Sequence, residues 1–143
     1  MGHELIFKKL DQITEILNEW ERLLRVPLEE FVRDLTAVRA AERNFQLAVD
    51  LASDINTQIL IGRGDKTPDT CRESFTALEK AGVLPHDLTR RLIESAKVRN
   101  ILVHEYDFED DYEKFYHAAG AGIPAYREYG KTIYEHIRSA KGI

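Results

Sequence analysis

The sequence has few of the residues that cross-link a chain or interrupt its helices. It contains one cysteine, Cys71, and four prolines in 143 residues. A lone cysteine excludes an intramolecular disulfide framework and is typical of a reducing compartment. No segment approaches the roughly 18 apolar residues of a membrane-spanning helix, and the first residues lack the pattern of a signal peptide. We therefore expect a cytoplasmic protein that does not enter a membrane.

An excess of positive charge is also absent. The chain has 25 acidic and 20 basic residues, which gives a formal net charge of -5. Such a balance does not favour a broad duplex-binding surface, so any nucleic acid must bind at a confined cationic site. No Cys and His spacing typical of a metal site occurs, and we expect neither a metal nor a cofactor.

What is present indicates one globular domain over residues 1–143. Hydrophobic residues make up 43% and charged residues 31%, close to the average of folded proteins. From Ile6 to Leu24 apolar residues recur every three or four positions, which predicts an amphipathic helix. Pro27 ends or restarts it, and a short helical piece then precedes a long helix that runs to Gly62.

The second half of the chain also predicts helices. Residues 62–69 form a loop that ends at an N-cap around Asp69 or Thr70, and the helix that follows stops at Gly82. The next helix runs from Pro85 to about His104. The last helical region starts near Asp110, and we expect Gly120 to Gly122 to interrupt it before a restart at Pro124. Together these elements predict an all-α, antiparallel up-and-down bundle of four to five helices.

An arginine stands out in the helix that ends near His104. Arg99 projects onto the same stripe as Leu88, Leu92 and Ala96, where a core residue is expected. The other faces of this helix are also largely apolar, so a symmetric dimer that packs the helix against its own copy would supply cover. Asn100 and His104 share a face, and Arg99 and Tyr106 share another if the helix continues. The simpler interpretation is a structural arginine, a histidine that complements the helix dipole and a tyrosine that packs the helix end.

Residues 99–106, Arg-Asn-Ile-Leu-Val-His-Glu-Tyr, carry a resemblance that favours a functional interpretation. The segment resembles the Arg-X4-His-X-Tyr signature of HepT toxins in the HEPN superfamily, including the usual Asn after the Arg. Residues 41–48 and the segments Glu73-Ser-Phe and Gly82-Val-Leu-Pro85 are also similar to that family's pattern. The resemblance covers nearly the whole chain.

The resemblance implies a HEPN-like, dimer-forming endoribonuclease toxin of a type VII-like HepT/MNT toxin–antitoxin system. In such an enzyme the ribose 2′-hydroxyl attacks the adjacent phosphate without a metal ion. Arg99 would bind the phosphoryl oxygens, His104 would transfer protons and Asn100 would orient His104 or the phosphate. The partner would be an MNT-type nucleotidyltransferase antitoxin, which transfers AMP to Tyr106.

Other interpretations remain open at this stage. The chain could instead be a non-catalytic substrate- or nucleotide-binding subunit of a minimal nucleotidyltransferase, or a purely structural helical dimer. The six acids between Glu105 and Glu113 oppose RNA binding there, and their simplest role is to favour the start of the following helix. Arg91 and Lys97 are more typical of solvated charges but lie near enough to Arg99 to help hold RNA.

Overall fold

The computed structural model describes the backbone of residues 3–104 and 108–140 and the side chains of residues 3–99 and 112–139. Within those ranges the chain forms six helices and no strand. In chain order they are α1 (His3–Leu23), α2 (Leu28–Arg33), α3 (Leu35–Gly62), α4 (Cys71–Lys80), α5 (His86–His104) and α6 (Phe108–Ala140). The predicted all-α bundle is confirmed, with the short piece after Pro27 present as α2.

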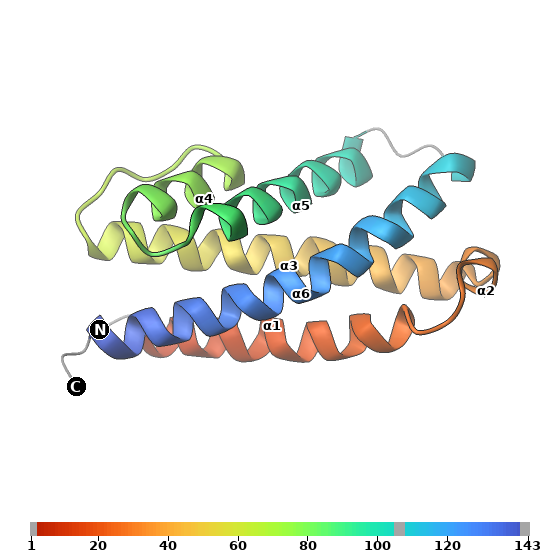
Figure 1. Ribbon diagram of the computed structural model, residues 1–143, viewed down its shortest axis with the longest axis horizontal. Helices are drawn as coiled ribbons and strands as arrows, with labels where there is room; N and C mark the ends of the chain where they lie inside the picture. Colours follow the sequence, from red (N-terminus) through yellow and green to blue (C-terminus); the bar gives the residue numbers. More distant parts are fainter. Residues whose placement is uncertain (1–2, 105–107, 141–143) are drawn as a thin grey trace.

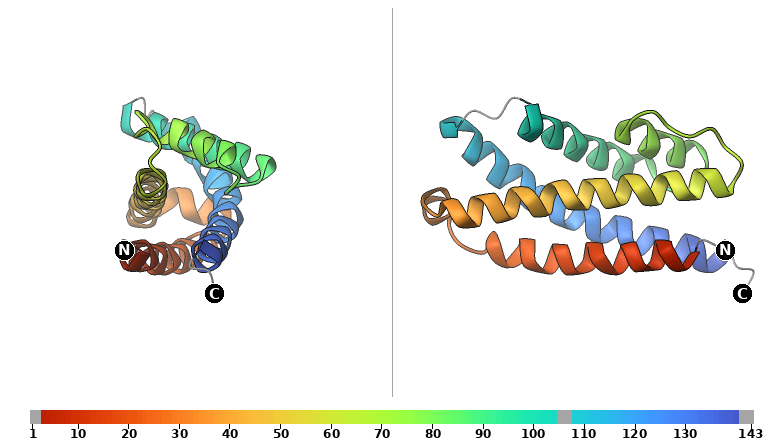
Figure 2. Two further views of the ribbon diagram at one scale, coloured as in Figure 1. Left: turned by 90° about the vertical axis from the view of Figure 1, so that its left-hand side faces the viewer. Right: turned by 180° about the vertical axis from the view of Figure 1, so that it is seen from behind.

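Three long helices form the base of the bundle. Helices α1, α3 and α6 lie side by side, and α1 packs against both of the others (Figures 1 and 2). Helices α4 and α5 lie across the other side of α3, and α5 also packs on α6 (Figure 1). The short α2 closes one end of the molecule by packing on α3 and α6. The arrangement places α5 between α4 and α6, where one of its faces meets the core.

Aromatic side chains join the three long helices at the centre of the core. Trp20 of α1 is fully buried, with its ring centroid 5.2 Å from that of Phe45 on α3 and 6.4 Å from that of Tyr126 on α6. The burial follows from the apolar stripe of α1, whose members face α3 and α6. Burying a side chain of this size stabilises the fold by about 2 to 3 kcal/mol.

Local hydrogen bonds fix both ends of α4. The Thr70 side chain accepts from the Glu73 amide at 3.0 Å, so Thr70 is the N-cap, one of the two residues that the sequence offered. At the other end Gly82 has a φ of +81°, the left-handed conformation that glycine adopts without strain. The Val83 amide then donates to the Leu78 carbonyl at 2.9 Å, which closes a Schellman motif and starts the turn into α5.

The predicted break at Gly120 to Gly122 is wrong, because α6 is continuous through it. Gly122 is buried, and a Cβ atom there would lie 3.1 Å from the Cη2 atom of Trp20, so this glycine makes room for the indole ring. Pro124 and Gly120 are both exposed. Proline deprives the Gly120 carbonyl of its helical partner, but at an exposed position water can take that place. Packing of the apolar residues on either side outweighs the local helix-breaking signals.

The two glycines provide a matched test of this explanation. A Cβ atom added at Gly120 would meet no atom within 4 Å, so Gly120→Ala should raise the free energy of unfolding by about 0.5 to 1 kcal/mol through helix propensity. Gly122→Val should lower it by about 1 to 3 kcal/mol, because the branched side chain overlaps the Trp20 ring. Urea unfolding of both variants measures the difference. Equal effects at the two positions would contradict the packing role of Gly122.

Candidate functional site

Helix α5 carries an arginine at the edge of its buried face. Leu88, Leu92 and Ala96 are buried at 1%, 0% and 2% exposure, and Arg99 continues their stripe by one turn. The Arg99 side chain is 26% exposed, so its guanidinium lies between the core and the surface. Arg99 therefore lies on the apolar stripe of α5, as its spacing in the sequence predicts.

Asp50 of α3 orients the Arg99 guanidinium. The Nη1 atom of Arg99 donates to the Oδ1 atom of Asp50 at 3.0 Å, and the Asp50 side chain is 55% exposed. The Nε atom of Arg99 is buried and has no acceptor among the described residues. Arginine presents its five N–H groups as a rigid fork, so holding one nitrogen fixes the direction of the others. Because the Arg99 side chain is 26% exposed, part of the guanidinium is accessible from the surface.

A buried hydrogen bond holds α5 one turn before Arg99. The hydroxyls of Ser95 and Tyr126 lie 2.6 Å apart, and the Ser95 hydroxyl donates to the Leu92 carbonyl of its own helix. The Tyr126 hydroxyl is therefore the donor to Ser95. Burial raises the pKa of Tyr126 well above its usual range, which keeps this donor protonated. The bond fixes the position of α5 against α6 and therefore also positions the next turn of α5, which carries Arg99.

A second buried polar chain joins α6, α3 and α4. The Tyr129 hydroxyl donates to the Asn56 Oδ1 atom at 2.6 Å, and the Asn56 amide donates to the Ser74 hydroxyl at 3.0 Å. Ser74 in turn donates to the Cys71 carbonyl at 2.6 Å. Each group in the chain is satisfied, so the network holds the first turn of α4 in one position on α3.

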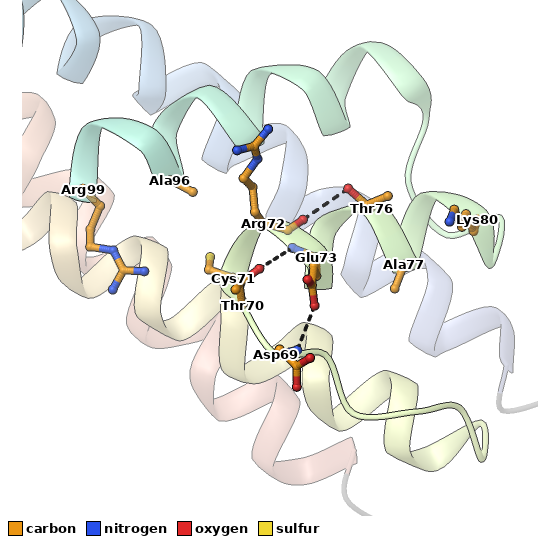
Figure 3. A pocket seen from close by; sticks show the side chains of 10 residues that line it. All are labelled: Asp69, Thr70, Cys71, Arg72, Glu73, Thr76, Ala77, Lys80, Ala96 and Arg99. Atoms are coloured by element: carbon orange, nitrogen blue, oxygen red, sulfur yellow. Dashed lines mark hydrogen bonds between the residues drawn. The ribbon is translucent and has the colours of Figure 1, made fainter. Parts of the chain in front are cut away.

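A pocket of about 860 Å³, open to solvent, lies between α4 and α5 beside Arg99. Figure 3 shows Arg99 at one end of the pocket and Lys80 at the other, with Arg72 between them on α4. Ala96 and Ala77 are small lining residues between the charged groups. The cations at this pocket and the orientation of Arg99 suit an anionic ligand.

Cys71 lines the same pocket but is poorly suited to nucleophilic chemistry. It is only 9% exposed, and burial is the main cause that raises the pKa of its thiol. The nearby Arg99 charge acts in the opposite direction with a smaller effect. The group is therefore a neutral thiol at neutral pH, whereas a nucleophilic cysteine needs the thiolate.

The predicted site residues differ in how far the structure places them. Arg99 stands at the pocket as described above. The backbones of Asn100 and His104 belong to the last turns of α5, but their side chains lie outside the described residues. Tyr106 lies wholly outside them. The predicted constellation of these four side chains therefore stays a prediction.

Arg91 and Lys97, for which the sequence favoured solvated charges over a role beside Arg99, form ion pairs on the surface. Arg91 forms an ion pair with Glu128 of α6 at 2.6 Å, and Lys97 forms one with Glu94 of its own helix at 3.2 Å. Neither of them lines the pocket beside Arg99. The pocket instead contains Arg72 and Lys80 of α4, which the sequence pattern did not single out.

Sequence reasoning also missed Asp50 and the buried polar chains. Asn56 and Ser95 stand at core positions of amphipathic helices, four residues after Ala52 and three after Leu92, and a polar residue at such a position signals a buried hydrogen bond. Asp50 gave no such signal, because it is exposed and lies 49 residues from Arg99.

Metal clusters and membrane-spanning helices are both absent from the described part of the chain. Among those residues, no group of three or more His, Cys, Asp or Glu side chains is placed to hold a metal ion. Within the same ranges, none of the helices combines the length and the apolar character needed to cross a membrane.

Comparison with known proteins identifies relatives of the sequence and of the fold. The profile of the family Ribonuclease HepT-like matches residues 13–133. A protein of Aphanizomenon flos-aquae (strain 2012/KM1/D3) described as tRNA nuclease HepT is 28% identical over 133 residues, which are 93% of this chain and 90% of that protein.

Solved structures share the same helical arrangement. A tri-AMPylated HEPN toxin of Shewanella oneidensis, in complex with an MNT antitoxin, matches with a TM-score of 0.82 at 22% identity, over 91% of this chain and 96% of that one. A cytosolic protein of unknown function from Bacillus subtilis, YutE, matches with a TM-score of 0.72 at 17% identity, over 93% of each chain. The predicted HEPN-like fold is confirmed.

The family match covers most of the chain, including α5 and its Arg99. It confirms the family that the sequence resembled. The chain belongs to the Ribonuclease HepT-like family.

Proposed function

We propose that this HepT-like ribonuclease is the toxin of a toxin–antitoxin pair, and that it cleaves RNA in the cytoplasm at a site centred on Arg99 and His104. One observation carries the proposal: the Arg99 guanidinium lines a pocket, is partly exposed there and is oriented by Asp50. A guanidinium held in this position can bind the phosphoryl oxygens of a substrate.

The chemistry of the site follows from the residue types. A phosphodiester gains negative charge on its phosphoryl oxygens as the ribose 2′-hydroxyl attacks phosphorus. Arg99 binds those oxygens through the accessible part of its guanidinium. The new P–O bond forms the cyclic phosphate, and the 5′-oxygen of the next nucleotide leaves with a proton.

Proton transfer is assigned to His104, five residues after Arg99 at the end of α5. Histidine can accept and donate protons near neutral pH. The reaction needs a base at the 2′-hydroxyl and an acid at the leaving oxygen, whereas each chain offers one His104. A homodimer with α5 near its two-fold axis provides both groups, and Asn100 orients His104 or the phosphate.

The relatives support this assignment of substrate and partner. The Aphanizomenon protein is described as a tRNA nuclease, so tRNA is the first substrate to test. The Shewanella toxin was solved in complex with an MNT antitoxin and carries AMP groups, so an MNT-type nucleotidyltransferase is the partner proposed for this chain.

The purified chain should cleave tRNA in the presence of EDTA, as a dimer of about twice its 16.5 kDa mass. His104→Ala should lower the cleavage rate at least about 100-fold, the usual contribution of a general acid or base. Gel assays measure cleavage, light scattering measures the mass and circular dichroism checks folding. His86→Ala is the matched control, because His86 is 80% exposed at the far end of the same helix.

Three results would contradict the proposal. Cleavage that EDTA abolishes and magnesium restores would replace the Arg99 and His104 chemistry with a metal site. A folded His104→Ala variant with the wild-type rate would remove His104 from the reaction. Absence of cleavage by a protein that binds nucleotides would support the non-catalytic nucleotide-binding subunit instead.

Tyr106 is the proposed acceptor of AMP from the partner. It follows Arg99 by seven residues, a spacing that places the two on one helix face wherever the helix continues. A phosphate attached to the Tyr106 hydroxyl would then compete with the substrate phosphate for the guanidinium. Silencing by this route requires no conformational change.

Tyr106→Phe tests the assignment because it keeps the ring and removes the acceptor oxygen. The variant should cleave RNA and resist silencing by the nucleotidyltransferase with ATP, whereas the wild-type chain should be silenced. Mass spectrometry locates the AMP groups. Tyr134→Phe serves as the control, because Tyr134 is an exposed tyrosine of α6 outside the site. Silencing of Tyr106→Phe to the wild-type extent would contradict the assignment.

A further inference from the structure

The pocket between α4 and α5 extends well beyond Arg99. We infer that it holds the RNA strand next to the cleaved phosphate, with Arg72 and Lys80 of α4 binding phosphates at two separate points along that strand. The inference rests on the proposed function, since Arg99 binds the cleaved phosphate at one end of the same pocket. It assigns a binding role to α4, a helix outside the signature segment.

The dimensions of the pocket fit a short single strand. Its volume is about 860 Å³, more than one side chain or one phosphate requires. The ten residues of α4 span about 15 Å at 1.5 Å per residue. A stacked strand advances about 3.4 Å per nucleotide, so this length corresponds to about four nucleotides.

The charged groups are placed along the pocket rather than at one point. Figure 3 shows Arg99, Arg72 and Lys80 spread from one end of the pocket to the other. Arg72 and Lys80 are exposed, and neither has an ion-pair partner among the described residues. A strand of regularly spaced phosphates matches such a row, whereas a single small anion would occupy only one of the three positions.

The surface between the cations suits a sugar or a base. Ala96 is buried and Ala77 is half-buried, and their small side chains leave space between α4 and α5. Thr76 adds a hydroxyl that donates to the Arg72 carbonyl. No bulky apolar side chain is among the described residues that line the pocket, so access does not depend on moving one.

Two carboxylates also line the pocket and restrict where the strand lies. The Oε2 atom of Glu73 accepts from the Asp69 amide at 3.0 Å, in the first turn of α4, where the helix dipole favours a negative charge. In Figure 3 the Glu73 and Asp69 carboxylates point away from Arg72, toward the loop before α4. A phosphate bound to Arg72 therefore lies away from these two carboxylates, which repel the backbone from their part of the pocket.

Binding of a 2′-O-methyl oligouridine tests the inference, because this strand lacks the attacking hydroxyl and stays intact during the measurement. Arg72→Ala and Lys80→Ala should each weaken binding about threefold or more at about 0.1 M salt. The logarithm of the association constant falls as the logarithm of the salt concentration rises, and each substitution should make this slope less steep by about 0.7. That is the value for one phosphate contact with a single strand. Asp69→Asn should tighten binding, because it removes a repelling charge.

Matched variants separate charge from structure. Arg72→Lys keeps the charge and should retain the salt slope of the wild type. Lys8→Ala removes an exposed charge on α1, outside the pocket, and should change neither the affinity nor the slope. The wild-type chain should bind a six-nucleotide oligouridine more tightly than a two-nucleotide one. The double variant with Arg72→Ala and Lys80→Ala should show a smaller difference in affinity between the two lengths.

The failure of this inference is distinguishable from failure of the proposed function. If the wild-type chain cleaves tRNA while Arg72→Ala and Lys80→Ala bind the oligonucleotide with unchanged affinity and slope, the role of α4 is wrong and the proposed function stands. If the wild-type chain neither cleaves nor binds RNA, the proposed function fails and the strand site fails with it.

Discussion

The burial of one face of α5 is the constraint on which the site depends. Leu88, Leu92 and Ala96 fix that face in the core, and the Tyr126 hydroxyl bonded to Ser95 fixes its position along α6. The next turn then brings Arg99 to the core edge, within 3.0 Å of Asp50 on α3. A guanidinium in that place costs desolvation, and the phosphate proposed as its ligand would account for an arginine where a core residue is expected.

Contacts in the rest of the bundle fix the positions of α4 and α5 relative to each other. The chain of hydrogen bonds from Tyr129 through Asn56 to Ser74 ties α4 to α3, and the Schellman turn at Gly82 sets how α4 leads into α5. Small side chains at Ala96 and Ala77 leave the space between them open. The same packing that stabilises the fold therefore shapes the pocket beside Arg99.

Much of this arrangement could be predicted from the sequence because it is encoded locally. The spacing of apolar residues predicted α1 and α3, and the helix-start and glycine signals predicted both ends of α4. The apolar stripe of α5 predicted that Arg99 lies at the edge of the core. The break in α6 was predicted wrongly, because the contact of Gly122 with Trp20 joins residues far apart in the sequence. Asp50, Arg72 and Lys80 were missed for the same reason: only the tertiary fold brings α3 and α4 to Arg99. Asn100, His104 and Tyr106 were singled out by their resemblance to a family signature, and their side chains stay predictions.

The most direct test of the account is the single-turnover cleavage rate of Arg99→Lys. Lysine keeps the positive charge but cannot make the two parallel hydrogen bonds of a guanidinium to a phosphate. The account predicts a folded protein whose rate is reduced at least about 100-fold, the loss expected when one group that stabilises the developing charge is removed. Arg91→Lys on the same helix, whose partner is Glu128, should keep the wild-type rate. A folded Arg99→Lys variant that cleaves at the wild-type rate would contradict the account.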